Sequence, residues 1–370
     1  MRALAGIFAG LLLTLLAPAS TARAYDITNR FSISGIAAGV YQYQFANGEA
    51  SAEDAGRGAV CFQPEFSFRP TLRDELFARI GLAAGNGLNR VTPFNLLPWA
   101  AYLQDDVKDI NGRNRDYLLT AWYKHTFQFS ENHTLALTGG LIDSTEYLDE
   151  NAFANDEFTQ FMNQALVNGP NSNAPSYDFG GAVQWAMNGF AISGAYMNVG
   201  ENDAGNNFNF FGVQIKYTVN SALGEGNYRL ILEGTDDAFL NPANTGTESR
   251  EAVFLSFDQM IGEILGGWIR FGWQSEDAAV DYRSLYSGGI HISGELWGRQ
   301  QDNIGIGYCY LIGGNTGFEH TQVAEGYVRF DLTGGLAATL DVQYMNDTYA
   351  PGAGTDVCGW IAGVRMTFEF

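Results

Sequence analysis

The first strand-like segment has the sequence Phe31-Ser-Ile-Ser-Gly-Ile-Ala-Ala-Gly-Val-Tyr-Gln-Tyr-Gln-Phe45. Near both of its ends, aromatic or aliphatic side chains occupy odd positions, and Ser or Gln occupies even positions. A period of two places these sets on opposite faces of a β-strand. The last segment repeats the pattern, with Trp360 and Phe370 on one face and Arg365 and Glu369 on the other. The chain therefore begins and ends with an amphipathic strand.

Fourteen further segments between these two have a comparable length and alternation, which gives sixteen in total. They cover residues 59–69, 74–84, 115–129, 133–143, 177–187, 190–199, 208–219, 226–235, 250–260, 265–275, 283–294, 303–313, 321–333 and 336–347. Most are close to the roughly 9–11 residues that a tilted strand needs to cross a bilayer. An even number of such strands predicts an all-β fold, a transmembrane antiparallel β-barrel of about 16 strands.

The connections between these segments alternate in length. Every second link is a short turn in most cases, such as Asn188-Gly189 and Gly334-Gly335, in which a positive φ costs little. The intervening links are longer, and two of them, 85–114 and 144–176, are long loops. Short turns on one side and long loops on the other are typical of outer-membrane barrels.

The two faces of the strands differ in charge. The strand face opposite the bulky apolar residues carries 11 of the 18 basic residues that follow residue 24. These are Arg30, Arg69, Arg79, Lys124, Lys216, Arg229, Arg250, Arg270, Arg283, Arg329 and Arg365. Several Asp and Glu residues have the same parity, which indicates a wet lumen surrounded by lipid. The alternative is an extracellular β-sandwich that is solvated on one face, but a sandwich does not explain the sorted loops.

Residues 1–24 have the pattern of a secretory signal peptide. Arg2 precedes an apolar stretch over 3–17, and Ala22-Arg23-Ala24 resembles a cleavage site. We therefore expect cleavage before Tyr25, export, and a single barrel domain over 25–370 in a bacterial outer membrane. The alternative is an uncleaved anchor. The three cysteines, Cys61, Cys309 and Cys358, are too few and too far apart for a disulfide framework.

The composition excludes several other classes of protein. The 370 residues include 20 Lys and Arg against 41 Asp and Glu, for a net charge of −21, so binding to nucleic acid by phosphate neutralisation is not expected. Disorder does not fit a chain that is 46% hydrophobic. After the leader there is no run of about 18 apolar residues, which argues against a helical membrane protein.

The loop 144–176 contains a segment with helical periodicity. Apolar residues recur at the spacing of one helix face, namely Phe158, Phe161, Met162, Ala165 and Leu166. Asn155 is a suitable N-cap, and Gly169-Pro170 ends such a helix. We predict a helix over about 156–167 in a loop that folds inward and constricts the channel. The alternative places this helix on the outer surface.

The same loop carries a resemblance to a known family. The segments Gly140-Leu-Ile-Asp-Ser-Thr-Glu-Tyr-Leu-Asp149 and Asp149-Glu-Asn-Ala-Phe-Ala-Asn-Asp-Glu-Phe-Thr-Gln-Phe-Met-Asn163 resemble the signature region of the carbohydrate-selective porins of the OprB type. The resemblance implies an outer-membrane barrel that passes sugars through a constriction of inward-folded loops. The sequence leaves undecided whether the segment 85–114 forms a second inward-folded loop. The terminal Phe370 resembles the signal by which the barrel-assembly machinery recognises such proteins.

A channel for sugars needs hydrogen-bond donors, acceptors and an aromatic surface, and it must bind weakly. The candidate solute-contacting residues are Arg79, Trp99, Trp122, Lys124, Asp149, Glu150, Asn155, Asp156 and Glu157. A basic ladder along the lumen is expected from Arg69, Lys216, Arg229, Arg270, Arg329 and Arg365. In the simpler interpretation these charges form a solvated ladder, Trp99 anchors a loop, and Trp122 packs in the lumen.

The sequence also bears on functions other than a sugar channel. The chain has only four His residues, no G-x-S-x-G motif and no His/Cys pair at metal-ligand spacing, so we expect no catalytic residue, metal or cofactor. A structural or adhesive barrel is a second alternative. Among channels, a general diffusion porin or one for anionic solutes competes with a sugar porin. The expected partners are small hydrophilic solutes and outer-membrane lipid, and monomer and homo-oligomer remain open.

Overall fold

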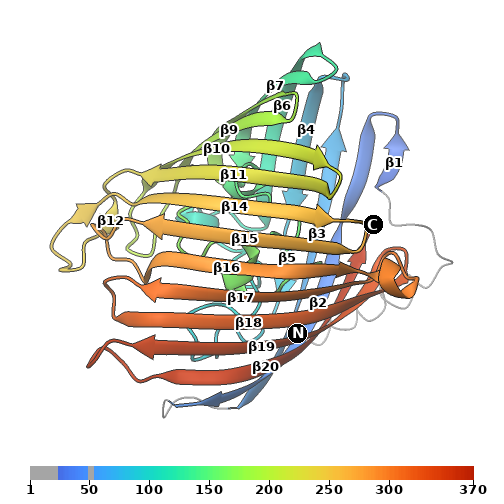
Figure 1. Cartoon of the computed structure of the whole chain (residues 1–370). Coiled ribbons are helices and arrows are strands. Elements are labelled where there is room, and N and C mark those ends of the chain that lie inside the picture. Colours follow the sequence, from blue (N-terminus) through green and yellow to red (C-terminus); the bar gives the residue numbers. More distant parts are fainter. Residues whose placement is uncertain (1–23, 49–53) are drawn as a thin grey trace.

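The computed structural model describes residues 24–48 and 54–370, and they form a β-barrel (Figure 1). The first half of the wall consists of β2 (Phe31–Asn47), β3 (Ala55–Phe68), β4 (Asp74–Ile80), β5 (Leu82–Ala84), β6 (Leu118–Ser130), β7 (His133–Ile142), β8 (Asp178–Met187), β9 (Phe190–Val199) and β10 (Phe208–Ser221). The second half consists of β11 (Gly224–Thr235), β14 (Glu251–Ile261), β15 (Leu265–Gln274), β16 (Tyr282–Ser293), β17 (Asn303–Gly313), β18 (Phe318–Thr333), β19 (Leu336–Tyr349) and β20 (Val357–Glu369).

The barrel is closed by its first and last long strands. Each strand is antiparallel to its neighbour, and β2 pairs with β3 on one side and with β20 on the other, from Ile36 opposite Glu369 to Asn47 opposite Cys358. β4 pairs with β3 and β6, and β5 follows it directly and pairs with β3. Because β4 and β5 act as one interrupted strand, the wall has sixteen strands. The short β1 (Tyr25–Thr28) pairs with the start of β2, where the partnership with β20 has ended. The predicted sixteen-stranded antiparallel barrel is confirmed.

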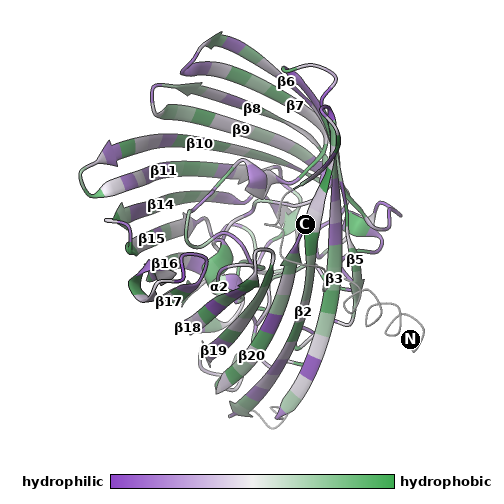
Figure 2. Ribbon diagram, turned by 90° about the vertical axis from the view of Figure 1, so that its right-hand side faces the viewer, coloured by the Kyte–Doolittle hydropathy of each residue, from purple (hydrophilic) through white to green (hydrophobic). Residues whose placement is uncertain are grey.

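The alternation along each strand separates a lipid-facing surface from the interior. In β2, Tyr41 and Phe45 are 56% and 49% exposed, whereas Gln42 and Gln44 between them are buried inside the barrel. On β20, Trp360 is exposed and Arg365 is buried. Figure 2 shows hydrophobic and hydrophilic residues following each other along the strands. Apolar side chains on the outside and polar side chains inside are the arrangement of a membrane barrel.

The connections are sorted between the two ends of the barrel. The end that carries the C-terminus has short turns, such as that between β10 and β11 (Figure 1). The other end carries the longer loops, one of which forms the small hairpin of β12 (Phe239–Leu240) and β13 (Thr247–Glu248). The link between β16 and β17 is longer than the other turns because it includes the 3₁₀-helix η3 (Gly294–Trp297).

Three further observations complete the fold. Within the described residues, no helix is both long enough and apolar enough to span a membrane. Cys61, Cys309 and Cys358 are free thiols. The predicted leader and its cleavage site at Ala22-Arg23-Ala24 lie almost entirely outside the described residues, which begin at Ala24.

Candidate functional site

The loop between β7 and β8, residues 143–177, lies inside the barrel. Figure 2 shows α2 (Gln164–Val167) surrounded by the ring of strands. Phe161 is almost completely buried, and its ring makes edge contacts with Trp268 of β15 and Tyr327 of β18. The apolar side of this loop therefore packs on the inner wall, and the helical loop is not on the outer surface.

The helix predicted over 156–167 is wrong in its extent, because α2 covers only Gln164–Val167. The backbone N–H groups of Met162 and Asn163 donate to the two carboxylate oxygens of Glu325 on β18, at 2.6 and 2.9 Å. A wall carboxylate thus satisfies donors that a helix would pair with carbonyls one turn earlier. Asn163, and not the predicted Asn155, caps α2 by accepting from the N–H of Ala165.

Three buried arginines of the wall hold the same loop through its carbonyl groups. Arg365 on β20 donates to the carbonyl oxygens of Glu157 and Gln160, at 2.6 and 2.9 Å. Arg270 on β15 donates to the carbonyl of Ala154, at 2.8 Å. A charged donor facing a carbonyl forms one of the stronger hydrogen bonds in proteins. These arginines act as anchors for the loop.

Arg229 on β11 completes the set of anchors. Its guanidinium donates to the carbonyl of Glu150 and forms an ion pair with Asp258, at 2.5 Å. Arg229, Arg270 and Arg365 are at most 2% exposed, so the loop covers them. The predicted basic ladder is therefore on the lumen face, but these three of its members are not open to solutes.

The remaining members of the ladder also have acidic partners. Arg329 pairs with Glu369 at 2.9 Å. Lys216 lies 3.4 Å from Glu150. Arg69 is largely exposed at the turn end of the barrel and pairs with Glu75.

The loop between β5 and β6, residues 85–117, also folds inward. The carbonyl oxygen of Pro98 accepts hydrogen bonds from Gln42 of β2 and Gln343 of β19, at 3.0 and 2.9 Å. Asn95 reaches Asp347 of β19 through its backbone N–H, at 2.9 Å. The segment 85–114, whose position the sequence left undecided, therefore folds into the barrel as well. Two loops narrow the channel.

Trp99 joins the two loops. Its ring is 1% exposed, packs edge-on against Phe158, and donates through Nε1 to the carbonyl of Glu157 at 3.0 Å. The structure thus places Trp99 as a loop anchor and not on an open surface. Trp122 stacks on Phe77 with ring centroids 4.9 Å apart, and the Nζ of Lys124 lies 4.9 Å above its ring.

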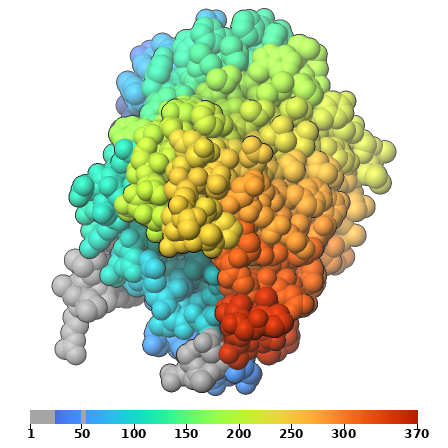
Figure 3. Space-filling view, turned by 90° about the vertical axis from the view of Figure 1, so that its left-hand side faces the viewer, coloured from blue at the N-terminus to red at the C-terminus, as the bar shows by residue number. Residues whose placement is uncertain are grey.

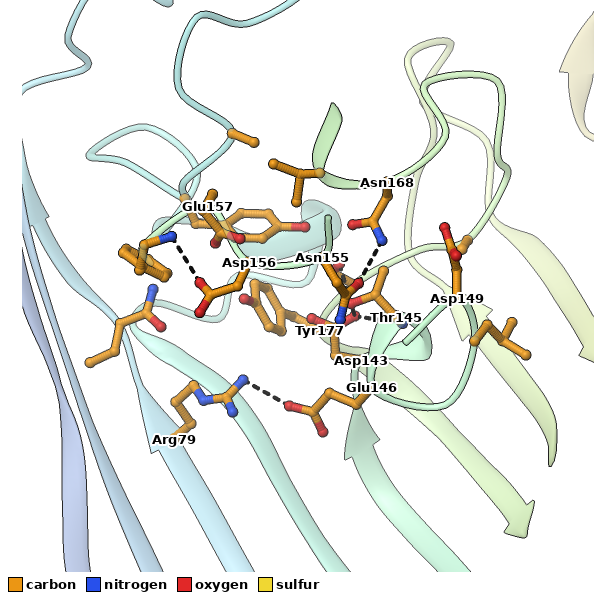
Figure 4. Close-up of a pocket in the computed structure, with 18 of the residues that line it drawn as sticks. Arg79, Asp143, Thr145, Glu146, Asp149, Asn155, Asp156, Glu157, Asn168 and Tyr177 are labelled. Carbon is orange, nitrogen blue, oxygen red and sulfur yellow. Dashed lines mark hydrogen bonds and ion pairs between the residues drawn. The ribbon is translucent and has the colours of Figure 1, made fainter. Parts of the chain in front are cut away.

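Between the two loops and the wall lies a cavity of about 740 Å³ (Figure 4). Among the described residues, eight carboxylate side chains line it, against one basic side chain, Arg79. The carboxylates are those of Glu65, Asp143, Glu146, Asp149, Asp156, Glu157, Glu233 and Glu369. Arg79 donates to Glu65 of β3 and to Glu146 of the loop, at 2.8 Å each, and so connects the wall to the loop.

Five of the predicted contact residues line this cavity, and four do not. Arg79, Asp149, Asn155, Asp156 and Glu157 line it. Trp99, Trp122, Lys124 and Glu150 are placed elsewhere on the loops and wall. Figure 4 shows the side chains of Asp156 and Asn155 on the loop above Arg79.

The sequence reasoning missed several residues of the cavity. Asp143 and Glu146 lie in and beside the 3₁₀-helix η2 (Ser144–Glu146), directly after β7. Asp143 accepts from the N–H and hydroxyl of Thr145, at 3.0 and 2.7 Å. The signal for this arrangement was present as Asp143-Ser-Thr-Glu146, since Asp before such a turn is a frequent N-cap. Tyr102 lies in a loop without an amphipathic pattern, and Tyr177 begins the segment 177–187, whose alternation predicts a strand but no place in a cavity.

Burial changes the protonation of the loop carboxylates. It raises the pKa of Glu157 to about 8, with the charge of Asp156 adding to the effect. It raises the pKa of Glu146 to about 6, although the neighbouring Arg79 opposes the shift. Burial also raises the pKa of Asp143. The charged groups that act on Glu146 and Glu157 are Glu65 and Arg79 on the wall and Asp143 and Asp156 on the loop.

The cavity offers polar and aromatic groups to a solute. Carboxylates accept hydrogen bonds, the Arg79 guanidinium donates them, and the tyrosines add partly apolar rings. Within residues 24–48 and 54–370, no group of three or more His, Cys, Asp or Glu side chains converges as a metal site.

Comparisons with known proteins give a consistent result. Residues 100–370 match the model of the carbohydrate-selective porin, OprB family. An uncharacterized protein from Aquifex aeolicus (strain VF5) is 25% identical over 335 residues, covering 89% of this chain and 95% of that protein. The high-pH structure of Pseudomonas putida OprB has a TM-score of 0.70 at 15% identity, over 92% of this chain and 94% of that one. The outer membrane channel DcaP of Acinetobacter baumannii has a TM-score of 0.55 at 11% identity, over 95% and 100% of the two chains.

Proposed function

The chain belongs to the carbohydrate-selective porin family, the OprB family, and from this premise we propose that it lets sugars diffuse passively and with weak selectivity across the outer membrane. Family and fold make it a porin channel of the outer membrane. The preference for carbohydrates is the proposal.

The observation that carries the proposal is the polar cavity between two anchored loops. A neutral sugar offers hydroxyl groups that can donate to Asp156 and accept from Arg79. Tyr102, which packs edge-on against the buried ring of Tyr177, lines the same cavity and offers aromatic surface to the apolar side of a sugar ring. The cavity volume of about 740 Å³ lies in the range of roughly 300–1,000 Å³ that is usual for sites of small molecules.

The alternatives are a general diffusion porin and a channel for small anionic solutes. The anionic alternative depended on the basic ladder, and three members of that ladder are buried under the loop. Eight acidic side chains line the cavity against one guanidinium, and those that are ionised repel anions. A general diffusion porin has no such objection and is separated from a sugar channel only by experiment.

Liposome swelling tests the proposal. The purified protein is reconstituted, and swelling is compared for neutral sugars of graded size and for equally large polar solutes that are not sugars. A sugar channel admits the sugars faster than size alone predicts. If all solutes follow one size dependence, the channel is a general diffusion porin.

A sugar titration of the single-channel current gives a second measurement. A weakly bound sugar interrupts the ion current in a concentration-dependent manner, because solute and ions share one passage. An ion current that no sugar reduces contradicts a binding site in the cavity.

We also propose that export removes residues 1–24 and that Phe370 is recognised during barrel assembly. Phe370 exchanges backbone hydrogen bonds with Gly35, at 3.0 and 3.1 Å, and its ring stacks on Phe62 and Phe368. Phe370 therefore extends β20 at the turn end of the barrel, where an assembly factor can reach it.

A further inference from the structure

The constriction cavity has two neighbouring cavities towards the loop end of the barrel. Two more cavities, of about 440 and 420 Å³, lie on the loop side and share Asn202, Asp203, Phe239 and Arg250. Ser172 lines all three cavities, so the three adjoin one another, and we take them together as the pathway of a solute. Figure 3 shows that the loop face of the molecule is hollowed. A solute that enters there meets the walls of all three cavities.

The walls of this pathway are acidic along its length. In the outer two cavities, described acidic side chains outnumber basic ones by six to two. The acidic residues are Asp105, Asp106, Asp109, Glu201, Asp203 and Asp281, and the basic residues are Lys108 and Arg250. In the constriction, eight carboxylates face one guanidinium. The excess of acid is therefore not confined to one cluster.

The basic residues that could have balanced this charge serve another purpose. Arg229, Arg270 and Arg365 lie on the lumen face but are buried, and each donates to carbonyl oxygens of the inward loop. The sequence predicts a basic ladder along the lumen, together with acidic residues on the same face. In the folded protein the loop covers much of that charge and presents carboxylates to the water.

Half of the constriction carboxylates have no cationic partner. Glu65 and Glu146 share Arg79. Asp149 pairs with Arg270, and Glu369 pairs with Arg329. Within the part of the chain that the structure describes, the other four form no ion pair, and they are Asp143, Asp156, Glu157 and Glu233.

A narrow aqueous passage with walls of one sign concentrates mobile ions of the opposite sign and repels those of the same sign. We propose that this channel is selective for cations and that, among charged sugars, it passes protonated amino sugars in preference to sugar acids. The first part concerns ions alone, and the second rests on the proposed sugar channel. Asp156 and Glu157, which line the constriction and form no ion pair within the described residues, are the specificity-determining residues.

Reversal potentials test the ionic part. The full-length mature protein is inserted into a planar bilayer between KCl solutions of tenfold different concentration. We expect K⁺ to be about threefold or more as permeable as Cl⁻, since wall charges raise the local cation concentration. A zero-current potential at zero, or on the chloride side, overturns the proposal.

A charge-neutralising variant assigns the selectivity to the constriction. Asp156→Asn with Glu157→Gln keeps the oxygen acceptors and removes two ionisable carboxylates from the cavity. The matched control is Glu131→Gln with Glu263→Gln, which changes two exposed residues of the turn end. We expect the permeability ratio to fall towards one in the first variant only. An equal fall in the control, or no fall in either, refutes the assignment.

A second variant guards against misfolding of the first. Asn168 lines the cavity and donates to the side chain of Asn155 at 2.9 Å, and Asn168→Lys adds a positive charge there. It is expected to lower the cation preference while the single-channel current persists. A preference that survives both variants overturns the proposed role of the constriction charges.

Liposome swelling separates this inference from the proposed function. Glucosamine, glucose and gluconate have similar size and differ in charge. We expect the rates to fall in that order. If the ionic selectivity holds but glucose enters no faster than size predicts, the sugar proposal fails alone. If glucose enters readily and gluconate keeps pace with glucosamine, the charge selectivity fails alone.

Discussion

Replacement of Arg365 by Met tests whether buried arginines hold the inward loop. The guanidinium donates to the carbonyls of Glu157 and Gln160 at 2.6 and 2.9 Å, and its side chain is completely buried. A hydrogen bond that involves a charged group contributes about 1.5–3 kcal/mol. Two such bonds contribute about 3–6 kcal/mol to holding the loop closed. Loss of about 3 kcal/mol raises the population of the open loop about 100-fold.

Hydrogen exchange followed by mass spectrometry measures this opening directly. In Arg365→Met, we expect the amides of peptides that cover 150–168 to exchange about 100-fold faster or more, with the strands β14 and β15 unaffected. The control is Arg283→Met, because Arg283 is 52% exposed in its side chain and its nearest acidic partner, Glu276, lies 3.7 Å away. No change is expected there.

The conservative variant Arg365→Lys adds a second comparison. One ammonium group does not reproduce the planar fork that spans two carbonyls, so the exchange rate should lie between those of the wild type and Arg365→Met. If Arg365→Met folds and inserts normally but accelerates exchange by less than about threefold, the estimate of about 3 kcal/mol is refuted. The loop would then be held by apolar contacts such as those of Phe161.

Three further predictions follow from the site. Because burial raises the pKa of Glu146 to about 6 and that of Glu157 to about 8, both lose their protons as the pH rises, with Asp143, Asp156, Glu65 and Arg79 as their charged neighbours. The preference for K⁺ should therefore increase between about pH 5 and about pH 9 in reversal-potential measurements, and a flat profile contradicts the assignment. Deletion of 150–168 should raise the single-channel conductance, whereas deletion of 241–246, in the outer loop beyond β12, should not; an unchanged conductance in the first case would place the segment outside the passage. Trp99→Ala should lower the urea stability of the barrel by about 3–5 kcal/mol, because a buried ring and its bond to Glu157 are lost, and a normal urea midpoint would argue against an anchoring role.

The strands could be predicted from the sequence because their signal is local. A period of two needs only a few consecutive residues, and in β2 it placed Tyr41 outside and Gln42 inside correctly. Strand number and the sorting of loops and turns follow from counting such segments. Closure between β2 and β20 follows because a membrane barrel leaves no open edge.

The course of the inward loop could not be predicted in the same way. Phe158, Phe161 and Met162 have helical spacing, yet most of the segment is not a helix. The acceptors that replace the helical hydrogen bonds come from Glu325 on β18, far away in sequence. Local periodicity contains no information about such a partner.

By itself, the sequence determined which residues face lipid and which face the lumen, since alternation along a strand fixes the side of the wall for each side chain. Only the tertiary structure decided which lumen residues meet water. Arg79, Arg229 and Arg365 all lie on the lumen face of their strands. The inward loop covers Arg229 and Arg365 and leaves Arg79 in the cavity. The physical reason is that the exposure of a side chain depends on where distant loops pack. The buried guanidinium groups donate hydrogen bonds to carbonyl oxygens of the inward loop, whereas the carboxylates stay in the passage.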